Sequence, residues 1–95
     1  MKALTLTEYI DQKVKSDPEF AKAYAKEEVI NNIAEMLVHA RNRGHITQAQ
    51  LAEKIGTTQS VISRIESGHG RYIPSLETLI RIASALNMKL QLRLK

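Results

Sequence analysis

The sequence of 95 residues predicts an all-α fold: a bundle of helices around a helix-turn-helix, with an N-terminal helical extension and a short C-terminal β-strand. Three observations lead to this prediction. Hydrophobic residues make up 43% of the chain and aromatic residues only 4%, so the core should be aliphatic, which suits packed helices better than a sandwich. Apolar residues recur at helical spacing over most of the chain. A glycine separates two short amphipathic segments, as a turn between two helices requires.

The N-terminal part of the chain predicts one short and one long helix. The short helix is expected at residues 7–15, with Thr7 as its N-cap. The long one should begin at Pro18, because Asp17 can cap it and proline suits the first helical position, where no amide donor is needed. It can continue to about Arg43.

The apolar stripe of this long helix is interrupted by charged residues at 26–28. One continuous helix and a break into two helices both remain open. We place a domain boundary there, so that residues 1–28 form the extension, residues 29–87 the helix-turn-helix domain and residues 88–95 the C-terminal strand.

Two short helices, at residues 48–55 and 58–66, form the predicted helix-turn-helix. Gly56 falls where the first must stop, and it supplies the left-handed conformation that other residues adopt only at a cost. Thr57 or Thr58 can cap the second helix by accepting its free amide protons. The inward faces consist of Leu51, Ala52 and Ile55 in the first helix and of Val61, Ile62 and Ile65 in the second.

The flanking residues predict how the chain enters and leaves this motif. Gly44 is expected to end the preceding helix in the left-handed conformation, and Thr47 to cap the next helix. A last helix is expected at residues 76–86, ended by Asn87. Its predicted inward residues are Leu76, Leu79, Ile80, Ala83 and Leu86.

The end of the chain changes from the helical period to a period of two. Met88, Leu90, Leu92 and Leu94 share one face, and polar or charged residues occupy the other. This alternation predicts a half-buried strand. No other segment has such a pattern, so we expect the same strand of a second copy to cover it, in a homodimer.

Charge is unevenly distributed along the chain. Residues 1–40 hold five lysines against seven acidic residues, net −2, whereas residues 41–95 hold nine lysines and arginines against three acidic residues, net +6. A phosphate-facing module with a mildly acidic appendage would show this asymmetry. The balance favours DNA as a partner of the second half.

Other function classes find no support in the sequence. Without cysteine there is neither a disulfide framework nor a thiolate metal site, and His39, His45 and His69 lack the spacing of metal ligands. No arrangement of nucleophile, acid and base suggests catalysis, so we expect no enzyme, no metal and no cofactor. No stretch resembles a signal peptide or could span a membrane, and a soluble cytoplasmic protein is expected.

The second helix of the motif is the candidate for entry into a DNA major groove. Side chains that reach bases lie on the exposed face of such a helix near its start, and removal of the core face leaves Gln59, Ser60, Ser63 and Arg64. Glutamine can bond both edge atoms of adenine, and arginine can bond guanine or a phosphate. Phosphate contacts are expected from Arg43, Thr47, Gln48, Thr58, His69, Arg71 and Tyr72.

One pattern runs from residue 41 to residue 86. It reads R-x-x-x-x-I-T-Q-x-x-L-A-x-K-I-G-T-T-Q-S-x-I-S-R-I-E-S-G, followed by P-S-L-E-T-L-x-R-I-A-x-A-L. In this respect the chain resembles the lambda-repressor-like (Xre-type) DNA-binding domains over about half its length. The resemblance implies base contacts from the second helix, a backbone contact from Gln48, and a structural ion pair between Arg41 and Glu66 that fixes the angle of that helix.

The layout of the whole chain is similar to the antitoxins of HigBA-type toxin-antitoxin modules. The likeness rests on a leader with D-P-E-F-x-x-x-Y, a long helix entering the motif, P-S-L-E-T-L after it and a final K-L-Q-L-R-L. It implies a repressor of its own operon that neutralises a small basic toxin of the RelE-like ribonuclease class. Two alternatives stay open: a stand-alone or phage-type regulator without a toxin, and a protein-interaction adaptor with the same fold.

Toxin binding is expected in the leader, because it belongs to the net acidic part of the chain and a toxin that binds RNA would present a basic face. Its aromatic residues Tyr9, Phe20 and Tyr24 are the candidate anchors, since aromatic side chains dominate such contacts. The alternative is that these residues complete the core of the domain itself.

Overall fold

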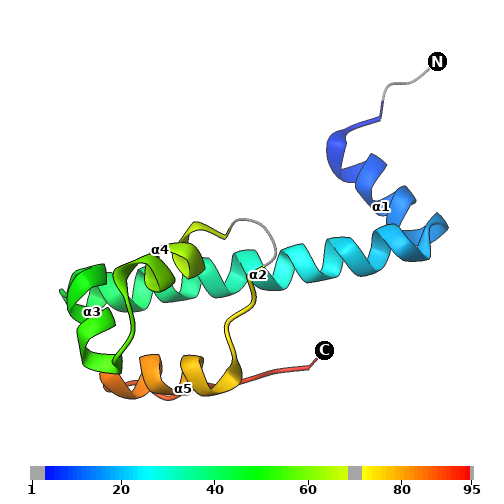
Figure 1. Cartoon of the computed structure of the whole chain (residues 1–95). Helices are drawn as coiled ribbons and strands as arrows, with labels where there is room; N and C mark the ends of the chain where they lie inside the picture. Colours follow the sequence, from blue (N-terminus) through cyan, green and yellow to red (C-terminus); the bar gives the residue numbers. More distant parts are fainter. Residues whose placement is uncertain (1–3, 69–71, 95) are drawn as a thin grey trace.

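The computed structural model describes residues 4–68 and 72–94. In this part of the chain it has five helices and no strand: α1 (Leu6–Ser16), α2 (Pro18–Arg43), α3 (Gln48–Ile55), α4 (Gln59–Ser67) and α5 (Leu76–Ala85). The molecule is elongated, with extents of 55 × 23 × 20 Å. Figure 1 shows α2 as its long axis, with α3, α4 and α5 around one end of α2 and α1 folded back at the other. The all-α prediction is confirmed.

Helix α1 begins earlier than predicted. The hydroxyl of Thr5, and not that of Thr7, accepts the amide proton of Glu8 at 3.1 Å, and the Glu8 carboxylate accepts the amide proton of Thr5 at 3.3 Å. The reason is that this reciprocal pair needs an acidic residue three positions after the cap, and Thr5 has one. The helix buries none of its residues completely, and among the described elements its main packing partner is α2.

Helix α2 runs without a break for 26 residues. One oxygen of Asp17 accepts the amide protons of Glu19 and Phe20, each at 3.1 Å, and Pro18 stands in the first turn as predicted. Its charged stretch at 26–28 does not end the helix, because lysine and glutamate are good helix formers. The expected domain boundary at 28/29 therefore lies inside one helix.

The turn after α2 differs from the prediction in one position. Gly44 is right-handed, with φ −80°, and its amide donates to the carbonyl of Ala40 at 3.1 Å. The helical hydrogen bonds thus continue one residue further than expected. His45 takes the left-handed conformation instead, with φ 55°.

The turn between α3 and α4 follows the prediction. The Thr47 hydroxyl accepts the amide proton of Gln50 at 3.0 Å, and Gly56 is left-handed with φ 72°. Of the two candidate caps for α4, Thr58 is the one that serves, since its hydroxyl accepts the amide proton of Val61 at 3.4 Å. Local chemistry alone therefore determines this turn.

The core lies where α4 packs against the second half of α2 and α3 packs against α4 and α5. Leu51 and Ile62 are completely buried at its centre. Around them lie Ile30, Ala34, Leu37, Ala52, Ile55, Ile65, Leu79 and Ile82. Within the described ranges, no helix has both the length and the apolar character needed to cross a membrane.

The inward face of helix α5 agrees with the prediction in part, since Leu79 and Leu86 pack inward as expected. Leu79 and Ile82 are buried, whereas Leu76 and Ile80, expected inside, are 53% and 52% exposed. The helix carries apolar residues on two neighbouring stripes, and packing against α3 takes the one that contains Ile82. The other stripe remains on the surface.

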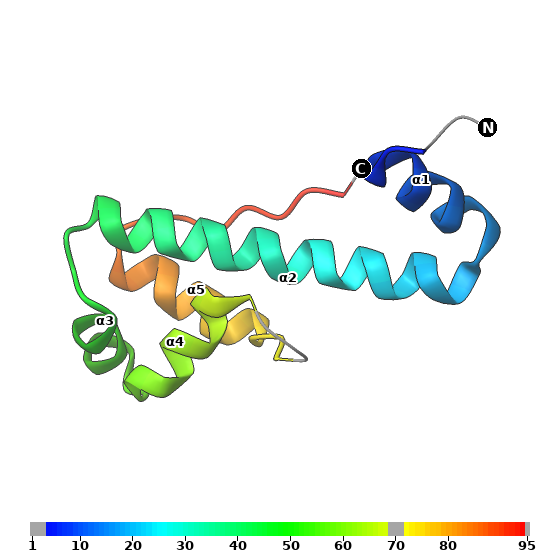
Figure 2. The same ribbon diagram turned by 90° about the horizontal axis from the view of Figure 1, so that it is seen from above.

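The predicted C-terminal strand is wrong for residues 88–94 of the single chain. Asn87 stops α5 in the left-handed conformation as predicted, with φ 57°, but the residues after it pair with no strand. A strand needs a hydrogen-bonded neighbour, and the other described segments are helices and their connections. Figures 1 and 2 show the segment leaving α5 as an extended trace.

The start of this tail lies over the domain. Met88 and Leu90 are partly buried and border a narrow groove of about 120 Å³ between α2 and α5. The groove is otherwise lined by Met36, Leu37, Ala40, Leu79, Ile82, Ala83, Leu86 and Lys89. Further along the tail, Leu92 is 71% exposed and Leu94 is fully exposed. The four leucine and methionine residues predicted to share one face therefore have two different environments.

Candidate nucleic-acid interface

Helix α4 presents one polar face to solvent. Ile62 and Ile65 turn inward, while the four residues predicted to read bases, Gln59, Ser60, Ser63 and Arg64, are all exposed. Together with Ser67 they border an open hollow of about 390 Å³. The structure thus brings these four side chains together on one accessible surface.

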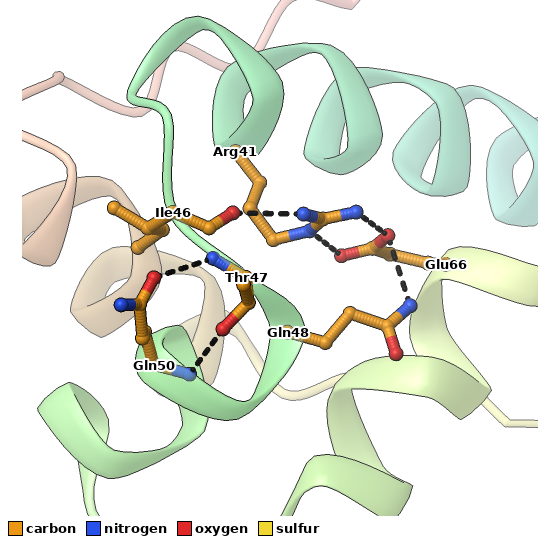
Figure 3. A network of polar contacts seen from close by, with 6 residues as sticks. All are labelled: Arg41, Ile46, Thr47, Gln48, Gln50 and Glu66. Atoms are coloured by element: carbon orange, nitrogen blue, oxygen red, sulfur yellow. Dashed lines mark hydrogen bonds and ion pairs between the residues drawn. The ribbon is translucent and has the colours of Figure 1, made fainter.

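An ion pair joins the end of α2 to the end of α4. Arg41 donates from Nε to one carboxylate oxygen of Glu66 at 2.7 Å and from Nη2 to the other at 3.0 Å (Figure 3). Its third donor, Nη1, bonds the carbonyl of Ile46 at 2.8 Å. The side chains are only 15% and 5% exposed, so the pair that the resemblance implied is present and is largely shielded from water.

Hydrogen bonding to Glu66 raises the pKa of the Arg41 guanidinium above its ordinary value, although burial acts in the opposite direction. The arginine therefore keeps its charge at every pH at which the protein can be handled. Because bidentate pairing has a fixed geometry, this contact restrains how α4 lies relative to α2.

Gln48 makes a contact that the sequence did not predict. Its Nε2 donates to Glu66 at 3.2 Å, so the amide is drawn into the network around the ion pair (Figure 3). The Nε2 atom carries a second proton that this contact does not use. A contact with a phosphate therefore remains chemically possible from this position.

Three other predicted phosphate residues remain exposed beside α4. Thr47 and Thr58 use their hydroxyl oxygens as caps, yet each hydroxyl retains its own proton for donation. Arg43 is exposed in the last turn of α2. The predicted contacts His69 and Arg71 lie outside the described residues.

Tyr72, predicted to contact a phosphate, lies against Arg64 on the exposed face of α4. Its side chain is partly buried and packs against the hydrophobic core. The guanidinium of Arg64 lies over its ring, 5.6 Å from the ring centre. Sequence reasoning did not find this contact, because the two residues lie on opposite sides of a loop.

Comparison with known proteins identifies the family. The helix-turn-helix family matches residues 38–92, more than half of the chain. This chain is a member of the Xre-type helix-turn-helix family. The resemblance noted in the sequence is therefore confirmed, and the matched residues include α3, α4, α5 and the Arg41–Glu66 pair.

Several curated proteins share parts of this chain. The ImmF control region 10 kDa protein of Bacillus phage phi105 is 40% identical over 50 residues, 53% of each protein. The cryptic phage CTXphi transcriptional repressor RstR of Vibrio cholerae is 38% identical over 58 residues, 61% of this chain and 50% of RstR. Antitoxin HigA1 of Mycobacterium tuberculosis is 29% identical over 90 residues, 95% of this chain and 59% of HigA1.

These matches differ in their extent. The chain spans between 50% and 59% of the length of the curated relatives it matches. The two phage proteins align over little more than a helix-turn-helix domain, whereas HigA1 aligns over nearly the whole chain. No solved structure matched the chain.

One contact that stabilises the Xre-type unit was missed in the sequence. The Arg81 guanidinium in α5 donates to the carbonyl of Ile55, the last residue of α3. Carbonyls at the end of a helix have no partner within it, so this bond satisfies one of them and ties α5 to α3. A basic residue within P-S-L-E-T-L-x-R was the available signal.

The candidate toxin-binding residues lie outside the Xre-type unit, towards the other end of α2. Phe20 and Tyr24 stack on each other with ring centres 5.9 Å apart, and the Lys13 ammonium lies over Phe20 at 5.3 Å. Tyr9 does not join this cluster and is 50% exposed on α1. Figure 1 shows α1 well away from α3 and α4. Among the described residues, no group of His, Cys, Asp and Glu could hold a metal ion.

Proposed function

We propose that this protein is a sequence-specific repressor that binds double-stranded DNA through α4. The observation that carries the proposal is the accessible face of Gln59, Ser60, Ser63 and Arg64 on a helix whose opposite side is buried and whose end is held by a bidentate ion pair. Rigid presentation of polar side chains is what reading of base edges requires. The family and the printed names of the phage relatives support this proposal.

The chemistry of the face assigns a role to each residue. Gln59 bonds the two edge atoms of an adenine, Arg64 bonds a guanine, and the two serines allow close approach or add single contacts. Arg43, Thr47, Gln48 and Thr58 contact phosphates on either side and fix the register on the duplex. Because phosphate contacts release counterions, binding should weaken steeply as salt rises.

A second copy supplies the remaining contacts. One helix-turn-helix reads a short site, and a twofold pair reads two half-sites one helical turn apart. The exposed Leu92 and Leu94 of the tail, beside the apolar groove bordered by Met88 and Leu90, are the surface we assign to the homodimer. Apolar side chains left this exposed on a small domain favour a partner.

We further propose that the repressor is the antitoxin of a HigBA-type module and neutralises a RelE-like ribonuclease. The supporting observation is the extent of the match to antitoxin HigA1, whose 90 aligned residues make up 95% of this chain and so extend far beyond the helix-turn-helix. The phage relatives lack an alignment of this length. The features that distinguish the chain from a bare helix-turn-helix are thus shared with an antitoxin.

The toxin-binding segment is assigned to residues 1–28. Within its described part, Leu4, Leu6 and Tyr9 are at least half exposed. Phe20 and Tyr24 are partly buried and stack on each other, with the Lys13 ammonium of α1 over Phe20. The exposed side chains of α1 are therefore the better anchors. Acidic side chains around them complement a basic toxin.

The antitoxin role is tested by co-expression with the neighbouring gene, followed by purification through a tag on this chain and a gel shift on the shared promoter. The proposal expects a small basic protein to co-purify, to lose its ribonuclease activity in the complex, and to leave the promoter fragment shifted. The second candidate, a stand-alone regulator, expects a shifted promoter without any co-purifying protein. Absence of a shift at low salt would contradict both.

A further inference from the structure

Arg64 is the one long basic side chain on the exposed face of α4, and such a side chain is a poor reader of bases when it is free. A solvated arginine loses rotamer entropy when it is fixed on a base. A reader of a particular base therefore gains from a contact that holds it in place before DNA arrives.

Tyr72 provides such a contact. Its ring belongs to the segment that leads into α5, and it is anchored because one side packs against the core. The Arg64 guanidinium lies over this ring, 5.6 Å from the ring centre. The support is therefore fixed to the body of the domain, not to α4.

This cation–π contact pairs none of the arginine donors with an acceptor. The guanidinium carries five N–H donors, and its attraction to the ring is electrostatic and occupies no hydrogen-bond acceptor. Within the described residues, no acceptor bonds this guanidinium. Its edge is available for the paired acceptors O6 and N7 of a guanine.

We propose that Tyr72 is a positioning residue that determines specificity, because its ring holds Arg64 ready to read one base pair. This inference rests on the proposed DNA-reading function. The sequence suggested that Tyr72 contacts a phosphate, whereas this inference assigns its contribution to the ring and not to the hydroxyl. Tyr72 acts through Arg64 and touches no base itself.

The test uses the full-length protein and duplexes that the wild type selects from a randomised pool. Each base pair of the selected duplex is then exchanged in turn, and affinities are measured for wild type, Tyr72→Phe, Tyr72→Leu, Arg64→Ala and the double variant Tyr72→Leu/Arg64→Ala. Phenylalanine keeps the ring and lacks the hydroxyl, so it separates the two possible roles of Tyr72.

The proposal expects Tyr72→Leu to weaken binding to the selected duplex by roughly two- to fivefold, the range of an exposed cation–π contact. The loss should be confined to the base pair whose preference Arg64→Ala also abolishes. Tyr72→Phe should restore wild-type affinity and preference, and Tyr72→Leu should have no effect in the Arg64→Ala background.

Three outcomes would overturn this assignment. If Tyr72→Phe lowers affinity for all duplexes alike and reduces the salt slope by about one ion, the hydroxyl contacts a phosphate. If Tyr72→Leu lowers affinity for the selected duplex by the same factor in the Arg64→Ala background as in wild type, the ring only supports packing. If Arg64→Ala leaves every base preference intact, Arg64 reads no base, whereas failure of the wild type to select any sequence would remove the proposed function itself.

A second measurement covers the case in which leucine at position 72 unfolds the domain. In wild type and in Tyr72→Phe, the side-chain protons of Arg64 should show an upfield ring-current shift in the NMR spectrum. Ordinary random-coil shifts for these protons in both proteins would contradict the contact between guanidinium and ring.

Discussion

In the proposed function, individual residues on α4 make the most direct contribution to DNA reading. Arg64→Ala and Gln59→Ala should each weaken binding to the selected duplex by about 1 to 3 kcal/mol and relax the preference at one base pair, because each removes a paired contact with a base edge. Fluorescence anisotropy on the original and on singly exchanged duplexes measures both effects. An equal loss on every duplex would show that the side chain contacts only the backbone.

Arg43 should behave differently, since we assign it to a phosphate. In Arg43→Ala, specific and non-specific affinity are expected to fall together, and the dependence of log affinity on log salt should flatten by about one ion. Affinities measured at several salt concentrations test this. Equal slopes for Arg43→Ala and wild type would remove Arg43 from the interface.

The Arg41–Glu66 pair is predicted to orient α4, and loss of one partner is predicted to lower the free energy of unfolding. Arg41→Met should lower the free energy of unfolding by about 3 kcal/mol, because it leaves a shielded carboxylate without its counter-ion. The double variant Arg41→Met/Glu66→Leu should be more stable than this single variant, since it leaves no buried charge. Urea denaturation of the three proteins decides this. A double variant that is less stable than Arg41→Met would show a net stabilising pair.

Gly68 is fixed by two constraints that no other residue type meets. It is left-handed, with φ 64°, and a Cβ there would lie 3.0 Å from Asn31 Oδ1 and 3.3 Å from Ala34 Cβ. Gly68→Ala should therefore cost about 1 to 2 kcal/mol from the backbone alone, with a further cost from the contact with α2. Gly44→Ala is the matched control, because Gly44 is right-handed and the change should stay within about 1 kcal/mol. Equal thermal unfolding midpoints for the two variants would contradict this account.

Among the elements, α3 and α4 could be predicted almost completely from the sequence. Their caps and the glycine between them are chemical signals within a few residues of the turn, and the structure uses all of them. The cap of α1 was equally local, but Thr5 and Thr7 compete for it and the pairing with Glu8 decides. The left-handed position lies at His45 and not at Gly44 because the helix makes one additional hydrogen bond, and no residue type in the sequence indicates that bond.

Helix α5 itself was predicted correctly, but the inward positions Leu76 and Ile80 and the strand in the tail were wrong, because they depend on what lies opposite. Leu76 and Ile80 are as apolar as Leu79 and Ile82, so periodicity cannot tell which stripe meets the core. Alternation in the tail shows which residues share a face, but a strand exists only beside another strand. The contact between Arg64 and Tyr72 likewise depends on how a loop brings them together.

Helices α1 and α2 give a prediction about separable functions. The buried residues of α2 begin at Ile30, and the main packing partner of α1 is α2, so the helix-turn-helix core does not depend on residues 4–28. A protein that starts at Val29 should keep its helical circular dichroism and bind the promoter, yet fail to neutralise the toxin in a ribonuclease assay. Neutralisation equal to that of the full chain, or unfolding, would show that the leader is not a separate toxin site.

At the scale of the whole molecule, the elongated shape separates two surfaces. The α4 face and the outer surface of α1 lie towards opposite ends of α2 (Figures 1 and 2), in a molecule with a long dimension of 55 Å. DNA and a toxin could therefore occupy one chain at the same time. The charge distribution agrees with this division, since the acidic excess lies in residues 1–40 and the basic excess in residues 41–95.

The proposed dimer is the second feature at this scale. Leu92→Glu/Leu94→Glu places two charges on the exposed end of the tail and should yield a folded monomer, because neither leucine contributes to the core of the chain. Its affinity for a palindromic duplex should fall much more than its affinity for a single half-site. Sedimentation equilibrium gives the assembly state, and a variant that remains dimeric would place the interface elsewhere.

The account as a whole depends on sequence-specific DNA binding by the face of α4. The most direct measurement is a titration of the full-length protein against duplex DNA from its own promoter and against a scrambled duplex of the same composition, at physiological salt. The account predicts binding to the promoter duplex at least about 10³-fold tighter than to the scrambled one. Equal affinity for the two duplexes would contradict it.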